Sequence, residues 1–216
     1  MRRAILFLML LLGQVLLAVV PLPAQQVVDR IVARVEEDIL TLSEVRELGR
    51  YQQLVERRAA RDDRLLAQLI EQWIVNTEAA AARFPRPGEA EINRELTRLE
   101  QQVGGPEAYR ERLRQIGLSA AAVRRQVERQ TYLASYLDYK FRPAVQVDAA
   151  ATEKYYREEL VPRLAEQAQA APPLETVQDQ IRELLVQREI SQRAALWLDE
   201  ARSRLKIELN AQENRP

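Results

Sequence analysis

The sequence predicts a mainly α-helical protein of about six to seven helices, closed by a small β-sheet that joins its two ends. Of the 216 residues, 30% are charged and 47% are hydrophobic, whereas aromatic residues make up 6% and only 6 residues are glycine. This balance suits amphipathic helices with exposed charged faces better than a β-sandwich. Strand-like alternation of apolar residues lies near both ends, which is why we expect the two ends to pair.

Cysteine and histidine are both missing from the sequence. Disulfides, thiolate or imidazole catalysis and Cys/His zinc sites are therefore excluded. Catalysis by carboxylates alone stays formally possible, but the acidic residues alternate with arginine and no pair stands out in an apolar setting. We predict no enzymatic activity, no cofactor and no metal site. The 32 basic and 32 acidic residues are interspersed and give a formal net charge of +0, so no cationic face is expected for nucleic-acid binding.

Residues 1–24 have the pattern of a secretory signal peptide. Two arginines precede an apolar run over residues 4–20, and prolines and the small Ala24 follow. We predict cleavage after Ala24, although Leu22 is larger than the residue usually found there. The alternative is an uncleaved anchor, because the run is at the short limit for spanning a bilayer. In either case the rest of the chain is expected to work outside the cytoplasm, and after cleavage without stable membrane insertion.

Residues 27–45, VVDRIVARVEEDILTLSEV, begin the predicted fold. Apolar alternation on both sides of a Glu-Glu-Asp turn predicts a β-hairpin. Thr41 and Glu44 form a capping-box pattern, which predicts a helix from Leu42 to about Ala60.

A second helix is expected to follow Asp62 and Asp63, whose charges suit a helix N-terminus. The segment PRPG at residues 85–88 ends it. We assign Trp73 on this helix, and Trp197 near the end of the chain, to the core. The long apolar stripe of this second helix contains Leu66, Ile70, Trp73, Thr77, Ala80 and Phe84.

Three further helices are predicted between residues 89 and 141. The first covers residues 89–103 and ends at Gly104-Gly105. The second is short and begins at Pro106. The third is long, with Ser119 as its N-cap, and reaches Phe141.

A connecting region is predicted between residues 142 and 173. Pro143 should keep the segment RPAVQV extended, and Asp148 should cap a sixth helix that runs through Tyr156. The Ala/Gln-rich stretch at residues 165–173 ends in Pro-Pro and is the best candidate for a flexible connector.

The last predicted helix covers residues 174–203 and is followed by RLKIEL, whose strict alternation predicts a strand. Because a lone hairpin is marginal and a lone strand leaves its backbone unpaired, we expect the three to form one sheet. We thus predict one core over residues 25–210, made of parts 25–147, 148–173 and 174–210, and a disordered tail at residues 211–216.

Several segments together carry a resemblance to a known family. VVDRIVARVEEDILTLSEV, LLAQLIEQWIVNTEA and LSAAAVRRQVERQTYLASYLDYKF resemble, in this order and after a signal peptide, the N-terminal domain of SurA-like periplasmic chaperones. LETVQDQIRELLVQREISQRAALWLDEARSRLKIEL resembles the C-terminal helix and strand that complete that domain. The resemblance covers nearly the whole mature chain.

One departure from that family changes the expected function. In SurA-like proteins, parvulin-type prolyl isomerase domains lie between the helix that EKYYREEL resembles and the C-terminal helix. Here only PRLAEQAQAAPP occupies that place, too short for a domain, and the histidines of a parvulin site are missing.

The resemblance therefore implies an ATP-independent chaperone of the periplasm, a holdase without isomerase activity. Its partners would be unfolded polypeptides, in particular outer-membrane protein precursors. Two alternatives stay open: an adaptor that binds one folded envelope protein, and a prolyl isomerase. The sequence also leaves open whether the chain is a monomer or a dimer that exchanges helices about the connector.

Peptide binding needs a partly apolar surface with adaptable contacts, and tyrosine offers an apolar ring with a polar tip. We expect this surface on the short helix, with an aromatic face of the long helix opposite it; packing of the tyrosines in the core is the alternative. If the tyrosines bind clients, replacing Tyr132 and Tyr136 with Ser should leave stability nearly unchanged. The candidates are Tyr109, Leu113 and Ile116, and Tyr132, Tyr136 and Tyr139.

Overall fold

The computed structural model describes residues 29–58 and 60–210 of the chain. The predicted signal peptide and the predicted tail lie outside these residues. Among the helices that are described, none is both long enough and apolar enough to cross a membrane.

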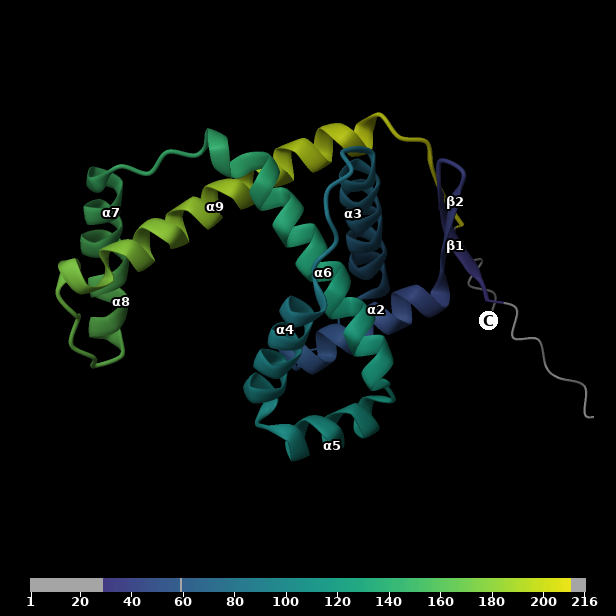
Figure 1. Ribbon diagram of the computed structural model, residues 1–216, viewed down its shortest axis with the longest axis horizontal. Helices are drawn as coiled ribbons and strands as arrows, with labels where there is room; N and C mark the ends of the chain where they lie inside the picture. Colours follow the sequence, from purple (N-terminus) through teal and green to yellow (C-terminus); the bar gives the residue numbers. More distant parts are fainter. Residues whose placement is uncertain (1–28, 59, 211–216) are drawn as a thin grey trace, which may run out of the picture.

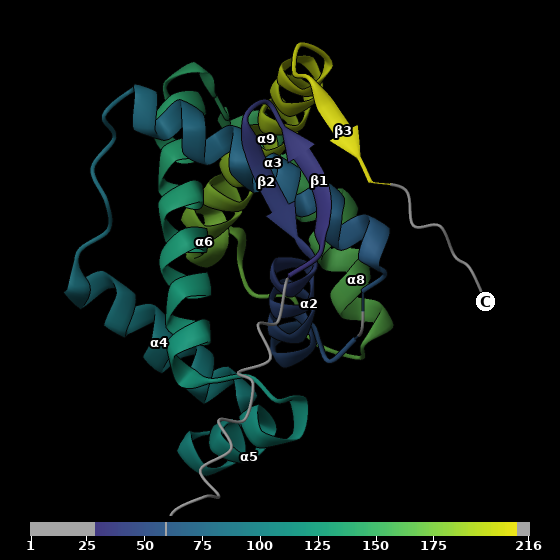
Figure 2. The ribbon, with the colours of Figure 1, turned by 90° about the vertical axis from the view of Figure 1, so that its right-hand side faces the viewer.

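A three-stranded antiparallel sheet joins the two ends of the described chain, as predicted. Strand β1 (Ile31–Val35) lies between β2 (Asp38–Thr41) and β3 (Ile207–Leu209). Ala33 pairs with Leu40 on one side and with Leu209 on the other. The backbone N–H of Glu36 donates to the Lys206 carbonyl at 3.0 Å. Figure 2 shows β3 beside β1, although the two strands are about 170 residues apart in sequence.

Helices α2 (Leu42–Glu56) and α3 (Asp62–Ala81) follow the hairpin. The predicted capping box is present: Thr41 Oγ1 accepts from the Glu44 N–H, and Glu44 accepts from the Thr41 N–H at 2.8 Å. Helix α2 ends four residues before the predicted limit, because Arg57 adopts a left-handed conformation.

The next three helices have the predicted bounds. They are α4 (Glu89–Val103), α5 (Pro106–Ile116) and α6 (Ala120–Phe141). Gly104 and Gly105 have φ values of 120° and 93°, which only glycine adopts without strain, and they turn the chain between α4 and α5. Ser119 caps α6 by accepting from the Ala122 N–H.

The region after α6 differs from the sequence-based expectation. Arg142–Ala144 forms a 3₁₀ turn, η1, so the segment is extended only after it. Helix α7 (Ala149–Tyr155) continues without a break into the π-helical η2 (Tyr156–Leu160) and α8 (Val161–Glu166). This joined helix is longer than predicted, and the connector begins at residue 167.

The π-helical turn coincides with a proline in the following turn. Pro162 has no N–H, and its ring would meet the carbonyl four residues earlier in a regular α-helix. The widened turn instead lets the Val161 N–H donate to the Tyr156 carbonyl, five residues back. The helix thus passes the proline instead of stopping before it.

Helix α9 (Leu174–Ser203) runs along one edge of the molecule, from α8 to the end of α3 (Figure 1). Its C-terminal half packs on α3 and α6 beside the sheet, and its N-terminal half carries α7 and α8 at the opposite end. We call α7, η2, α8 and residues 174–188 the arm, and the rest of the described chain the body. Counting α7, η2 and α8 as one helix, the described residues contain seven helices, which confirms the predicted fold class.

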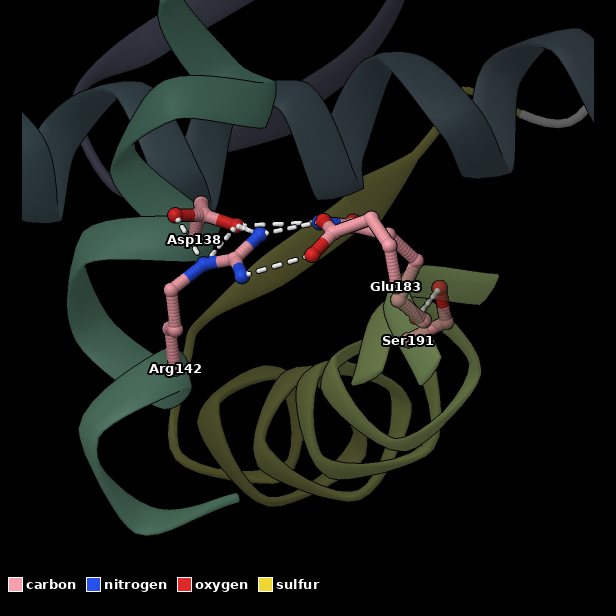
Figure 3. Close-up of polar contacts among 5 residues, drawn as sticks. Asp138, Arg142, Glu183 and Ser191 are labelled. Carbon is pink, nitrogen blue, oxygen red and sulfur yellow. Dashed lines mark hydrogen bonds and ion pairs between the residues drawn. The ribbon is translucent and has the colours of Figure 1, made fainter. Parts of the chain in front are cut away.

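A polar cluster fastens α9 to the end of α6 where the arm begins (Figure 3). The Arg142 guanidinium donates to Asp138 at 2.8 Å and to Glu183 at 2.6 Å. Gln187 also donates to Asp138, at 3.1 Å. Hydrogen bonds from Arg142 and then Gln187 lower the pKa of Glu183 to about 2.

Candidate functional site

The predicted residues of α5 belong to a core cluster. Leu113 is buried, with 7% of its surface exposed, and Tyr109 and Ile116 are half-buried against the same cluster. Their neighbours include Leu54 of α2 and Val123 of α6. The α5 residues therefore hold α5 against α2, α4 and the first half of α6.

The predicted tyrosines of α6 lie in a different cluster. Tyr132 and Tyr136 are only 2% and 3% exposed, and they pack on Phe84 with ring centroids 5.8 and 5.5 Å away. The Tyr132 hydroxyl donates to the Phe84 carbonyl at 3.3 Å. Tyr139 continues the stack but is 64% exposed.

These positions correct two sequence-based expectations. The α5 residues and the α6 tyrosines do not face each other across one surface, because they pack in separate clusters at different levels of α6. Tyr132 and Tyr136 fill the core, so their replacement by Ser is expected to destabilise the fold. The assigned core residues Trp73 and Trp197 are half-buried, each at the edge of a cluster.

A groove elsewhere in the body has the properties that were expected of the tyrosine face. It is an open hollow of about 360 Å³ between α2, α3, α6 and α9. Leu48, Val75 and Leu133 lie beneath its floor and are buried. The accessible apolar side chains are Val55, which is 46% exposed, and the half-buried Leu137 and Leu198. Four glutamines surround this floor: Gln52, Gln68, Gln72 and Gln130.

A second hollow, of about 390 Å³, continues the groove between α2, α4 and α6. Both hollows are lined by Tyr51, Val55 and Gln130. The Tyr51 hydroxyl donates to the Gln130 side chain at 3.2 Å, so this residue pair separates the first hollow from the second. We call the two hollows together the central groove.

The amide groups of the groove can serve both backbone donors and backbone acceptors. A glutamine side chain carries one acceptor oxygen and an NH₂ donor. Gln52 donates to Gln68, while the Oε1 atom of Gln72 is buried and has no hydrogen-bond partner among the described residues. Extended polypeptide exposes the matching N–H and C=O groups in every sequence.

The ionisable side chains of the groove differ in burial: Tyr51 is buried and Glu71 half-buried, whereas Glu56 is exposed and Glu95 pairs with the exposed Arg98. Burial raises the pKa of Tyr51 to about 12, with smaller effects from Tyr109 and Glu95. Burial also raises the pKa of Glu71, although Arg202 opposes the shift. No lysine or arginine is among the described residues that line the first hollow. The first hollow is therefore amide-rich with Glu56 and Glu71 as its acidic residues, and in the second hollow Arg98 pairs with Glu95.

The sequence reading missed the groove because its glutamines belong to three different helices. Each glutamine lies beside an apolar stripe. In the sequence alone, such a glutamine cannot be distinguished from one that faces solvent. A usable signal was the repeated occurrence of glutamine, instead of a charged residue, at the border of the stripes on α2, α3 and α6.

The described residues contain no group of three or more acidic side chains arranged to hold a metal ion. Compared with models of known protein families and with curated protein sequences, the chain matches none. The resemblance to SurA-like chaperones stays a prediction.

Proposed function

We propose that the chain is an ATP-independent, SurA-like chaperone of the periplasm that holds unfolded polypeptides in the central groove. Precursors of outer-membrane proteins are the proposed clients, following the family resemblance. Unlike SurA-like proteins with parvulin domains, the chain is proposed to bind its clients without isomerising their prolyl bonds.

One observation carries the proposal: an open hollow in which four glutamine side chains surround the accessible apolar residues Val55, Leu137 and Leu198. Such apolar side chains gain free energy by covering aliphatic and aromatic client side chains. The amides satisfy the client backbone without requiring a particular sequence. Such a surface suits many clients, each held in extended form.

Release without ATP requires that the affinity be moderate. A dissociation constant near micromolar corresponds to roughly 8 kcal/mol and still allows exchange with a folding or insertion pathway. The open groove is consistent with rapid exchange.

Suppression of aggregation tests the proposal. The chain from Gln25, which contains every described element, is prepared in buffer without nucleotide. An outer-membrane β-barrel protein unfolded in urea is then diluted into this buffer. Light scattering should fall in proportion to the added chain and reach a plateau near stoichiometric ratios. A well-folded chain that gives no protection would contradict the proposal and favour an adaptor with one folded partner.

A matched pair of variants tests whether the groove is the binding site. Val55→Glu places a charge where both hollows meet, whereas Leu196→Glu places the same charge on a side chain that is 73% exposed and lies outside the groove. Both positions are exposed, so both variants should keep their stability within about 0.5 kcal/mol. Val55→Glu should lose most of the protection, and Leu196→Glu should keep it. Equal activity of the two would move the binding site elsewhere.

A further inference from the structure

The first hollow of the central groove carries acidic side chains and no basic ones. Glu56 at the end of α2 and Glu71 of α3 line it, whereas no lysine or arginine is among the described residues that do so. Neither carboxylate forms an ion pair within the part of the chain that the structure describes. The hollow therefore places an excess of negative charge beside the accessible side chains of Val55, Leu137 and Leu198.

The charged residues next to the hollow leave this excess in place. Arg202 and Asp199 of α9 are both close enough to Glu71 to act on its pKa, and they act in opposite directions. The two arginines that follow Glu56 in the sequence are exposed, and neither of them lines the hollow. The negative charge of the hollow is thus not matched by its surroundings.

Glu71 is the more important of the two carboxylates. It is half-buried, whereas Glu56 is exposed. Burial raises the pKa of Glu71, and the attraction of Arg202 is too weak to reverse this shift. The charged form of Glu71 is therefore incompletely stabilised in the protein by itself. A cation in the hollow would stabilise it, and the attraction is stronger at this half-buried position than at an exposed one.

We infer that the first hollow selects client segments in which lysine or arginine lies beside apolar residues. This inference rests on the proposed function. The apolar part of the segment covers Val55, Leu137 and Leu198, and the basic side chain reaches Glu71 in the same hollow. Lysine and arginine suit this arrangement, because their methylene stems pack on apolar surface while their charged heads bind a carboxylate.

The same charges disfavour acidic clients. A client Glu or Asp in the hollow would lie near two carboxylates and would find no basic partner among the described residues that line it. The glutamine contacts to the client backbone do not depend on client charge, so they provide an affinity that neutral segments share. Affinity should therefore fall from basic to neutral to acidic segments.

Three labelled peptides test the inference. They share one apolar segment and differ at two flanking positions, which are Lys, Gln or Glu; fluorescence anisotropy at low salt measures their binding to the chain from Gln25. The Lys peptide should bind roughly fivefold more tightly than the Gln peptide, and the Glu peptide should bind more weakly than both. Salt at about 0.5 M should bring the three affinities together, because it screens the charges.

Variants of the hollow identify the carboxylates that are responsible. Glu56→Gln/Glu71→Gln removes both charges with little change of shape and should bind the Lys and Gln peptides with equal affinity. Glu71→Gln alone should remove more of the preference than Glu56→Gln alone, because Glu71 is half-buried and Glu56 is exposed. Circular dichroism checks that each variant is folded, and if the double variant unfolds, the order of the two single variants decides.

The control variant removes the same charge elsewhere. Glu158→Gln/Glu166→Gln changes exposed residues of the arm, in η2 and α8 and outside both hollows, and should keep the preference for the Lys peptide. A preference that survives in Glu56→Gln/Glu71→Gln, or that falls equally in the control, would overturn the inference.

The outcomes separate this inference from the proposed function. Val55→Glu removes an apolar contact of the groove, and its effect is measured with the neutral Gln peptide. Binding of the Gln peptide that Val55→Glu abolishes, with no preference for the Lys peptide, would overturn only the selection by charge. Failure of all three peptides to bind would overturn the groove and its selectivity together.

Discussion

The body is built around three buried apolar clusters, whereas none of the described arm residues belongs to any of them. In the arm, Thr152, Tyr155 and Ile181 are the buried side chains. Ion pairs supplement them: Arg188 contacts Glu159 at 3.0 Å and lies over the Tyr155 ring. The arm is thus a set of helices with little core of its own, attached through α9.

The difference between body and arm separates two kinds of stabilisation. Buried apolar area contributes most of the folding free energy, and exposed ion pairs contribute little. The groove lies in the body, so the proposed client binding should depend on the body, while the arm should open locally at lower cost. Three variants test this view, from the largest expected effect to the smallest.

Replacing Tyr132 and Tyr136 with Ser should destabilise the body strongly. Each buried ring that is removed leaves a cavity, and comparable truncations cost about 3–5 kcal/mol. Urea denaturation followed by circular dichroism measures the loss. Tyr139→Ser, in the same stack but 64% exposed, is the matched control and should change stability by less than about 0.5 kcal/mol. Unchanged stability of the double variant would return these tyrosines to the list of client-binding residues.

Tyr155→Ala should loosen the arm without loosening the body. Its ring is 5% exposed and is the largest buried side chain of α7. Hydrogen exchange of amides in residues 149–166 should speed up by roughly tenfold or more, while amides of α3 keep their protection. Tyr155→Phe keeps the ring and serves as the control. Equal acceleration in α3 would mean that arm and body unfold as one unit.

Arg142→Gln should have the smallest effect, and the effect should depend on pH. Hydrogen bonds from Arg142 lower the pKa of Glu183 to about 2 and also lower that of Asp138. A lowered carboxyl pKa in the folded state stabilises the protein above the unfolded pKa of 4.5, and this contribution is lost as the pH falls toward 2. Because these side chains are partly exposed, the contribution is below about 1 kcal/mol.

Thermal melts at low salt check this prediction. The melting temperature of Arg142→Gln should lie slightly below that of the unchanged chain at pH 7 and coincide with it near pH 2. Arg182→Gln, which removes an ion pair to Asp179 within α9 alone, is the control for charge. A difference that persists at pH 2 would assign Arg142 a packing role instead.

The fold was largely predictable because local signals agreed with the final structure. Thr41, Ser119 and Asp148 each cap the helix that was expected to begin there. The alternation in RLKIEL and in the hairpin also predicted their pairing, since neither segment could satisfy its backbone alone. Propensity and tertiary structure conflict little in these segments.

Where the prediction failed, contacts between distant segments outweighed local preference. Proline disfavours the helical conformation in the residue before it, yet Arg142 before Pro143 is helical, with φ −53° and ψ −39°. In this conformation Arg142 donates to Asp138 and Glu183.

The groove could not be predicted because it also depends on contacts between distant segments. Its glutamines form one site only after α2, α3 and α6 converge, and no spacing within a single helix encodes that.

The pairing of β1 with β3 also imposes an order in time. A chain is made from its N-terminus, so β1 and β2 emerge long before residues 207–209 exist beside them. Until then one edge of β1 has no partner strand, and the Val32 carbonyl lacks the hydrogen bond that the N–H of Asn210 donates in the complete fold. The sheet can therefore be completed only after β3, the last strand, has been made. A chain truncated before β3 would be left with an open edge, the kind of surface that aggregates.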